Sequence, residues 1–388
     1  MQGDVLCLSH LRWGFVYQRP NHLMTRCARD HRVFFVEEPI HQKTATPHLT
    51  FEEVAPNLEV VVPRLPHGLS PHESERLQRE LLDRLVRDAE VRNPLLWLYT
   101  PMALGFARHL RTSLTVYDCM DELSGFQGAP PVLREREREV FAMADLVFTG
   151  GLSLYEAKRV HHPRVHAFPS SVDAAHFAKA RTRGAAVEPE DQRSIPHPRL
   201  GFFGVIDERM DVELLRKAAL ARPGYHFVIL GPVVKIDPAR LPRLPNIHYL
   251  GPKKYDELPA YLGGWDVATM PFALNEATRY ISPTKTLEYL AAGKPVVSTP
   301  IHDVVRPYGE EGLVRIAKTA DELVREIDAA LAERDTAHFE IRRASCDAWV
   351  ARTSWDTTWS HMRSLIHDAL ERRRQNKTET QETPCSTI

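Results

Sequence analysis

Residues 281–299, with the sequence ISPTKTLEYLAAGKPVVST, constrain the fold of this chain more than any other stretch. Pro283 favours the start of a helix, because proline has a helical φ and lacks the amide hydrogen that a first turn leaves unpaired. The following residues predict a short helix from about 284 to 292, and Gly293 is typical of the position just past a helix C-terminus. Residues 295–299 are rich in β-branched side chains and predict a strand.

Two charged side chains of this helix share one face. Lys285 and Glu288 are three residues apart, so they lie about one turn from each other. The unpaired backbone N–H groups of the first turn lie ahead of both. A cation, a carboxylate and free amides in this arrangement suit a phosphate next to a ring that bears hydroxyl groups. A lone glutamate on an exposed helix is, in contrast, usually only solvated.

The rest of the chain alternates predicted strands with predicted helices. A strand starts at Leu200, and other apolar runs that predict strands are at residues 4–9, 33–37, 58–63, 95–99, 115–117, 144–149, 165–168, 226–230, 247–250, 266–271 and 313–316. A helix starts near Arg19, and helical patterns cover residues 73–91, 134–143, 255–262, 321–334 and 338–371. This alternation predicts an α/β fold with doubly wound parallel sheets and right-handed crossovers.

Length and polarity divide the chain into two domains. At roughly 100–200 residues per domain, 388 residues favour two domains of ordinary size. Residues 181–198 are polar and contain proline without an apolar period, so they are predicted to link a domain at 1–180 to a domain at 199–345. Residues 346–371 are predicted as a C-terminal helix, and the polar residues 372–388 as a disordered tail.

Composition and the lack of certain motifs exclude several classes of function. The formal net charge of -1 provides no field that would attract nucleic acid. No apolar run approaches the roughly 20 residues of a membrane span, and the first residues do not resemble a secretory signal. Five scattered cysteines and 19 histidines without ligand spacing predict a reducing cytoplasm and no metal site. The Walker and Gly-x-Ser-x-Gly motifs of P-loop NTPases and α/β-hydrolases are also missing.

Ligands of open parallel sheets bind beyond the carboxyl ends of the strands, so the loops after the strands contain the candidate residues. In the first domain, residues 117–122 place Asp118, Asp121 and Glu122 at a strand end. Like charges this close favour a carboxylate with a shifted pKa, which could act as a general base. Asp121 is the preferred base and Asp118 the second choice. An aspartate here could equally cap the helix that follows.

The loop between residues 10 and 19 is a second candidate in the first domain. Gly14 would allow the backbone to approach a phosphate or a sugar, although a tight turn explains this glycine equally well. Trp13, Arg19 and His22 are candidate contacts to a substrate. Arg19 and His22 could instead order the loop.

Residues 281–299 resemble the donor-nucleotide motif of GT-B glycosyltransferases, in particular the large group related to glycogen synthases and mannosyltransferases. Glu288 matches the late Glu of the family's Glu-seven residues-Glu motif, which binds the ribose of a nucleotide sugar, whereas Tyr280 stands in place of the early Glu. Residues 18–23, QRPNHL, are similar to a signature of bacterial cell-surface polysaccharide glycosyltransferases of families 4 and 1, including those of teichuronic acid biosynthesis. Residues 169–173 partly match the Asn-Gly-Val-Asp signature that closes the first domain in many GT-B enzymes.

The resemblance implies a fold and a reaction. Two Rossmann-like domains would face each other across a cleft, and the C-terminal helix would cross back onto the first domain. The implied enzyme moves a sugar from a nucleotide-sugar donor to a glycan or lipid-linked acceptor in the cytoplasm, without metal or cofactor, and allows peripheral contact with the inner membrane face. The implied base is Asp121 or Asp118, the acceptor-binding residues are Trp13, Arg19 and His22, and the donor-binding residues are Gly14, Gly204, Arg209, Tyr280, Pro283, Thr284, Lys285 and Glu288.

Two positions depart from the family. Val205 replaces an Arg that often follows the glycine of the first strand in the second domain, so Arg209 and Lys285 are the predicted substitutes that hold the diphosphate. Arg209 could instead pair with Asp207 or Asp211 at the surface. Tyr280 leaves the stereochemistry open, because the related family retains the anomeric configuration whereas an aspartate base implies inversion.

Two other functions are compatible with the sequence. A non-hydrolysing nucleotide-sugar epimerase would use the same scaffold and need no acceptor. A non-catalytic GT-B subunit would bind a partner or a glycan; Val205 and Tyr280 favour it, whereas Lys285 and Glu288 oppose it.

Overall fold

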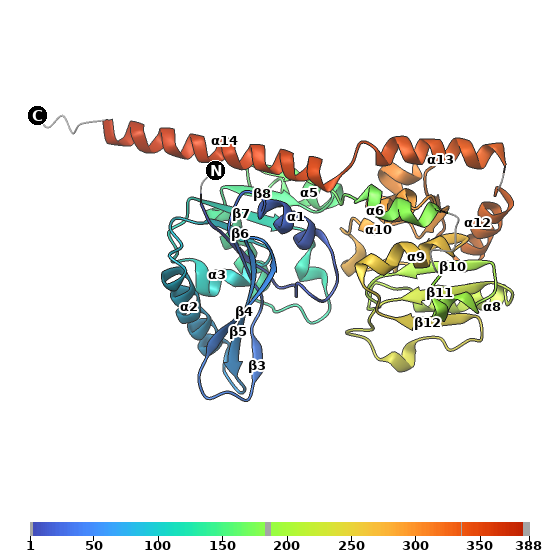
Figure 1. Cartoon of the computed structure of the whole chain (residues 1–388), viewed down its shortest axis with the longest axis horizontal. Helices are drawn as coiled ribbons and strands as arrows, with labels where there is room; N and C mark the ends of the chain where they lie inside the picture. Colours follow the sequence, from blue (N-terminus) through green and yellow to red (C-terminus); the bar gives the residue numbers. More distant parts are fainter. Residues whose placement is uncertain (1–2, 183–187, 335, 383–388) are drawn as a thin grey trace, which may run out of the picture.

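The computed structural model describes residues 3–182, 188–334 and 336–382, and it shows two α/β domains that lie side by side (Figure 1). Each domain is built on one sheet with helices packed on it. The chain passes from the first domain to the second after β9 (Val165–Ala167) and returns between α13 (Ala337–Val350) and α14 (Trp355–Glu382). The two doubly wound domains predicted from the sequence are confirmed.

The first domain contains a nine-stranded sheet in the order β3-β5-β2-β1-β6-β7-β8-β9, with β4 paired to β5. Its strands are β1 (Val5–Leu8), β2 (Val33–Val36), β3 (Ile40–Gln42), β4 (His48–Ala55), β5 (Leu58–Pro66), β6 (Leu95–Leu98), β7 (Leu114–Cys119), β8 (Leu146–Thr149) and β9. Strands β1, β2, β6, β7 and β8 are buried at every residue, as expected for parallel strands covered on both faces. The sequence does not predict β3 and β4, because their residues are partly exposed and lack an apolar run.

The helices of the first domain follow its strands. They are α1 (Arg19–Cys27), α2 (Pro71–Asp88), α3 (Leu104–Ala107), α4 (Leu133–Met143) and α5 (Leu152–Lys158). Ser70 begins α2 with a capping box, in which the Ser70 hydroxyl accepts from the Glu73 amide and the Glu73 carboxylate accepts from the Ser70 amide.

The second domain contains a six-stranded parallel sheet in the order β12-β11-β10-β13-β14-β15. The strands are β10 (Arg199–Phe203), β11 (His226–Leu230), β12 (Ile247–Gly251), β13 (Val267–Met270), β14 (Val296–Ser298) and β15 (Arg315–Ile316). Its helices include α8 (Val212–Ala221), α9 (Leu258–Gly263), α10 (Thr284–Ala291), α11 (His302–Val304) and α12 (Ala320–Ala332).

The C-terminal helices join the two domains. Helix α13 contributes Cys346 and Val350 to the core of the second domain, whereas α14 crosses the first domain and contributes Trp355 to its core (Figure 1). The predicted helix 338–371 is therefore interrupted after Val350, where Ser354 accepts a hydrogen bond from an amide of the next helix. The predicted disordered tail at residues 372–388 is corrected for residues 372–382, where α14 continues through mostly good helix formers, whereas residues 383–388 lie outside the described residues.

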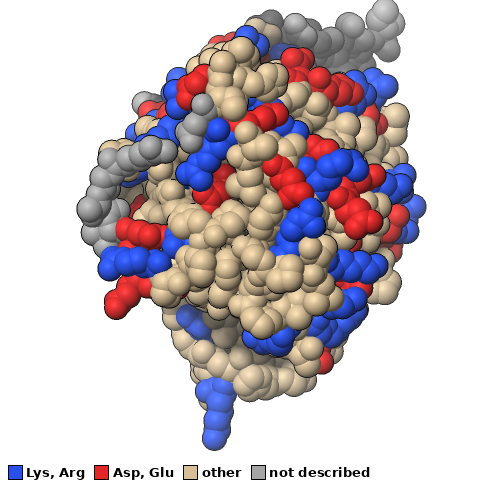
Figure 2. Space-filling view, turned by 90° about the vertical axis from the view of Figure 1, so that its right-hand side faces the viewer, with Lys and Arg blue, Asp and Glu red and all other residues tan. Residues whose placement is uncertain are grey.

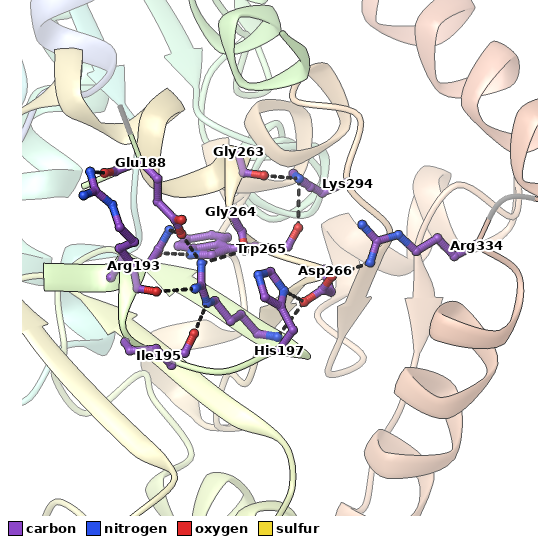
Figure 3. Close-up of polar contacts among 12 residues, drawn as sticks. Glu188, Arg193, Ile195, His197, Gly263, Gly264, Trp265, Asp266, Lys294 and Arg334 are labelled. Atoms are coloured by element: carbon purple, nitrogen blue, oxygen red, sulfur yellow. Dashed lines mark hydrogen bonds and ion pairs between the residues drawn. The ribbon is translucent and has the colours of Figure 1, made fainter. Parts of the chain in front are cut away.

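Much of the predicted linker packs onto the second domain (Figure 3). Helix α7 (Glu190–Arg193) lies in it, and the buried Gln192 accepts a hydrogen bond from Trp265 Nε1 at 2.9 Å. The buried carboxylate of Asp266 accepts the Arg199 amide at 2.7 Å, at the end of the same segment. A polar sequence can be buried here because its polar groups find partners. Residues 183–187 of the predicted linker lie outside the described residues.

The outer end of the second domain has a mixed surface. Figure 2 shows acidic and basic side chains interspersed on this face, as the net charge of -1 leads one to expect. Within the described part of the chain, none of the helices has the length and apolar character needed to cross a bilayer.

Candidate active site

The helix–turn–strand unit predicted from the sequence forms α10 and β14. Pro283 is the N-cap of α10, and Thr284 is its first residue. Gly293 has a φ of +70°, in the left-handed region where a helix commonly ends with glycine. Glu288 is buried and Lys285 is half-buried on this helix. These local predictions are confirmed, whereas the functional roles of the residues stay predictions.

Gly204 allows Lys285 to lie against the end of β10. Its φ is +143°, and a Cβ at this position would lie 2.3 Å from Lys285 Cε. A Cβ on Gly231, at the end of β11, would lie only 1.8 Å from the Gly204 carbonyl oxygen. The two glycines therefore place an ammonium group at the carboxyl edge of the sheet, which is the edge where parallel sheets bind ligands.

Glu288 and Lys285 occupy a desolvated position. Burial raises the pKa of Glu288, and the Lys285 charge offsets only part of this effect. Burial lowers the pKa of Lys285, with the Glu288 charge acting in the opposite direction. Thr284 Oγ1 donates to Glu288 Oε2 over 3.4 Å, which is the one side-chain hydrogen bond of Glu288 among the described residues. The carboxylate therefore has acceptor capacity left for hydroxyl groups of a ligand.

Arg209 is held by Asp207, which is the alternative that the sequence left open. Its Nε and Nη2 atoms donate to the Asp207 carboxylate at 2.9 and 2.7 Å. Burial by itself would lower the pKa of Arg209. The hydrogen bonds and the negative charge of Asp207 outweigh this effect, so the pKa of Arg209 is raised. The Nη1 atom has no hydrogen-bond partner among the described residues. Arg209 is thus a fixed cation with one donor group still free.

Asp121 of the first domain lies close enough to these cations to interact with them electrostatically. Burial raises the pKa of Asp121 to about 6, and the positive charges of Arg209 and Lys285 partly oppose this rise. The short 3₁₀ turn after Asp121 has no side-chain cap, so the alternative role of Asp121 as a helix cap is not realised. A half-buried carboxylate that does not cap a helix and has a pKa near 6 has the properties of a general base.

Three other predicted site residues of the first domain have structural roles. Arg19 Nε and Nη2 donate to the Asp118 carboxylate at 3.1 and 2.9 Å, and Nη1 donates to the Phe168 carbonyl at 2.7 Å. Both charged side chains are buried, which favours the alternative that Arg19 orders its loop, whereas the roles of Asp118 as a base and of Arg19 as an acceptor contact stay predictions. His22 is buried and stacks on Trp355 with ring centroids 4.6 Å apart, and desolvation lowers its pKa to about 3. It fastens α14 to the first domain.

The remaining predicted residues lie in three different surroundings. Gly14 is exposed, and a Cβ there would meet nothing within 4 Å, so no close approach requires this glycine. Trp13 is half-buried and packs edge-on against Phe35 with a centroid distance of 5.1 Å. Tyr280 packs against an apolar cluster of the first domain. Among the described residues, Gly14, Trp13 and Tyr280 make no hydrogen bond, ion pair or ring contact with Glu288, and their predicted roles stay predictions.

Sequence reasoning missed three residues between the domains. His10 follows β1, and its buried Nδ1 atom has no hydrogen-bond partner in the part of the chain that the structure describes. Desolvation lowers the pKa of His10 to about 4, and the charge of Lys235 in the second domain adds to this effect. Phe126 lies under Arg209 and Lys235, with cation-to-centroid distances of 5.5 and 5.3 Å. His10 could have been found from its place after a strand, but Phe126 and Lys235 give no sequence signal.

The match to known families agrees with this geometry. Residues 197–333 match the family described as glycosyl transferases group 1, and this segment contains Gly204, Arg209, Lys285 and Glu288. Over 204 residues the chain is 30% identical to a Bacillus subtilis (strain 168) protein named "Putative teichuronic acid biosynthesis glycosyltransferase TuaH". This alignment covers 47% of the chain and 50% of that protein, so the chain spans about half the length of its curated relative.

Solved structures share the fold over nearly the whole chain. An α,α-trehalose-phosphate synthase (UDP-forming) from Burkholderia vietnamiensis has a TM-score of 0.68 at 14% identity and covers 96% of this chain and 100% of its own. The sucrose-phosphate synthase of Thermosynechococcus elongatus has a TM-score of 0.66 at 14% identity, with 94% and 98% covered. WaaG, a glycosyltransferase involved in lipopolysaccharide biosynthesis, has a TM-score of 0.64 at 12% identity, with 93% and 99% covered. The chain therefore has the GT-B fold, and residues 197–333 of its second domain match the glycosyl transferases group 1 family.

Proposed function

We propose that this chain is a glycosyltransferase that moves a sugar from a nucleoside diphosphate donor to a glycan or lipid-linked acceptor in polysaccharide biosynthesis. The observation that carries the proposal is the approach of Asp121, from the first domain, to Arg209 and Lys285 of the second. The family match over 197–333 and the names of the similar proteins TuaH and WaaG support the reaction class.

The second domain is assigned to the donor. Glu288, when ionised, accepts hydrogen bonds from the ribose hydroxyls. Lys285 and the free Nη1 of Arg209 offset the charge that grows on the diphosphate as the sugar leaves, which stabilises the transition state more than the ground state. An incoming diphosphate also favours the charged form of Lys285, because a nearby opposite charge raises the pKa of an amine.

The first domain is assigned to the acceptor and to proton transfer. Asp121 takes the proton of the acceptor hydroxyl as this hydroxyl attacks the anomeric carbon. Its raised pKa makes it a better base than an ordinary aspartate while it stays ionised at neutral pH. This role implies inversion of the anomeric configuration, and a product with retained configuration would remove the role from Asp121.

The proposed reaction needs no metal or cofactor, because Arg209 and Lys285 supply the positive charge at the diphosphate. If the acceptor is linked to a lipid, the chain has to contact the inner face of the membrane at least transiently. This peripheral contact, and the cytoplasmic location that goes with it, are part of the proposal.

Thermal unfolding of the full chain with UDP-, GDP- and dTDP-sugars tests donor binding. A ligand at 100 times its Kd stabilises a folded protein by about 2.7 kcal/mol, so a preferred donor should raise Tm. Glu288→Gln should weaken this donor at least tenfold, because the amide is a poorer acceptor for two ribose hydroxyls. Glu156→Gln, at an exposed glutamate on α5, is the matched control and should bind like the wild type.

Product analysis separates the proposal from its two alternatives. A transferase releases a nucleoside diphosphate and needs an acceptor for turnover. An epimerase would convert a UDP-sugar into a new UDP-sugar without release of UDP. A non-catalytic subunit would do neither, and failure of every nucleotide sugar to raise Tm would contradict the proposed donor site.

A further inference from the structure

A cavity of about 360 Å³ lies where the chain crosses between the two domains. Phe168 and Ser170, after β9, form one part of its wall, and Arg352 and Thr353, between α13 and α14, form another. Its volume is within the range of about 300–1,000 Å³ that small-molecule sites have. The residues assigned above to the donor and to the base do not line it, so it is separate from the candidate active site.

The wall of this cavity contains an arginine whose side chain has no ion-pair partner among the described residues. Arg352 and His361 make no side-chain ion pair or hydrogen bond among the described residues, and Arg306 reaches Glu310 only at 3.7 Å in an exposed pair. The one carboxylate in the wall, Asp303, is already used as an acceptor of backbone amides. An anionic group can therefore bind here without displacing an existing partner of Arg352.

The other wall residues suit a hydroxylated ring. Trp349 and Tyr308 lie edge to face with centroids 5.8 Å apart, and they form an apolar surface against which the C–H face of a sugar can pack. Thr353, Thr357 and Thr358 place hydroxyl groups in the same wall, where they can donate to or accept from sugar hydroxyls. Charge, hydroxyls and aromatic faces together favour a sugar that carries a phosphate.

Two wall residues connect the domains to each other. Asp303 of the second domain accepts hydrogen bonds from the amides of Leu152 and Ser153, at 2.8 and 3.0 Å, and so caps α5 of the first domain. Ser170 Oγ of the first domain donates to the Ser282 carbonyl at 2.5 Å. Ser282 is followed closely by α10, which carries the predicted donor residues. A ligand that contacts residues of both domains at this junction binds best when the two domains are arranged as observed. Binding therefore favours this arrangement.

We propose that this cavity binds a small phosphorylated sugar and that binding stabilises the observed arrangement of the two domains. The site has the size, the unpaired arginine and the hydroxyl groups that such a ligand requires. It does not depend on the proposed glycosyl transfer, because none of its contacts belongs to the donor site.

Isothermal titration calorimetry of the full chain with glucose 1-phosphate tests the site. One ligand should bind per chain. Arg352→Glu should weaken binding at least tenfold, and His361→Ala should weaken it less. Arg352 is exposed, and its side chain has no partner among the residues that the structure describes, so its replacement should leave the fold intact. Arg84→Glu makes the same change of charge at an exposed arginine of α2 and should bind like the wild type. Glu288→Gln tests whether glucose 1-phosphate binds at the donor site instead of the cavity. This variant should retain binding.

Three results would overturn the proposed site. The first is that no binding is detected at millimolar glucose 1-phosphate. The second is that Arg84→Glu and Arg352→Glu lose affinity equally. The third is that Glu288→Gln loses affinity whereas Arg352→Glu does not. Inorganic phosphate that binds as tightly as glucose 1-phosphate would contradict the sugar part of the proposal. Hydrogen exchange tests the coupling: saturation should slow exchange in the peptide that contains the amides of Leu152 and Ser153, and unchanged exchange would contradict the coupling.

Discussion

Two groups of buried or half-buried charges lie near the carboxyl ends of parallel strands, and they differ in how completely the charges are satisfied. In the first domain, Arg19 and Asp118 form a bidentate pair, and Arg19 also donates to a carbonyl. Between the domains, Asp121 and Lys285 form no direct ion pair among the described residues, and they interact with Arg209 and with each other only at longer range.

This difference separates structure from function. A buried pair whose donors and acceptors are all used cannot gain from a ligand, and it is costly to break. A buried charge without a direct partner is energetically unfavourable. An incoming diphosphate or hydroxyl group can supply the missing ion pair or hydrogen bond. We therefore propose that the incomplete group is the functional one, although both groups contain polar residues near the carboxyl ends of strands.

Breaking the complete pair should have the largest effect, and the effect should be on stability. Arg19→Ala leaves the Asp118 carboxylate buried without its partner, which should lower the free energy of unfolding by about 3–5 kcal/mol in urea titrations. The control is Arg76→Ala, which removes an exposed pair with Glu80 and should cost less than about 1 kcal/mol. Equal losses in the two variants would show that the Arg19–Asp118 pair has no special structural role.

Changing the incomplete group should affect activity and spare the fold. Asp121→Asn should lower kcat by about 10²–10⁴, the usual contribution of a general base, while Tm in the absence of ligand stays near the wild-type value. Donor binding, measured by the rise of Tm with the preferred nucleotide sugar, should persist, since Asp121 is not a donor contact. An Asp121→Asn enzyme with full kcat would exclude this residue as the base, and His10 would then be the candidate base.

The pH dependence of kcat/KM is expected to show the smallest effect. Burial raises the pKa of Asp121 to about 6, so this carboxylate gains a proton at a higher pH than an ordinary aspartate does. Because a base acts in the deprotonated form, kcat/KM should fall about tenfold for each pH unit below 6 and level off above it. The acidic limb should vanish from the residual activity of Asp121→Asn, and an unchanged limb would assign it to another group.

Local patterns in the sequence predict local structure well in this chain. Pro283, the spacing of Lys285 and Glu288, and Gly293 predict α10 and its end, because a cap, a helical period and a left-handed glycine act over a few residues. The same kind of reasoning fails for the tail after residue 371, where polar composition suggested disorder but α14 continues.

The two α/β domains, the helix that carries Lys285 and Glu288, and the glycines at the strand ends follow from the amino-acid sequence, since each depends on neighbours in the chain. Which charges are satisfied depends instead on how the chain folds in space. Arg19 and Asp118 are 99 residues apart and meet because the first residue of α1 lies against the carboxyl end of β7, and Asp121 approaches Arg209 and Lys285 because two domains face each other. Electrostatic partners of this kind are set by distances in space, which a local pattern of residues does not contain.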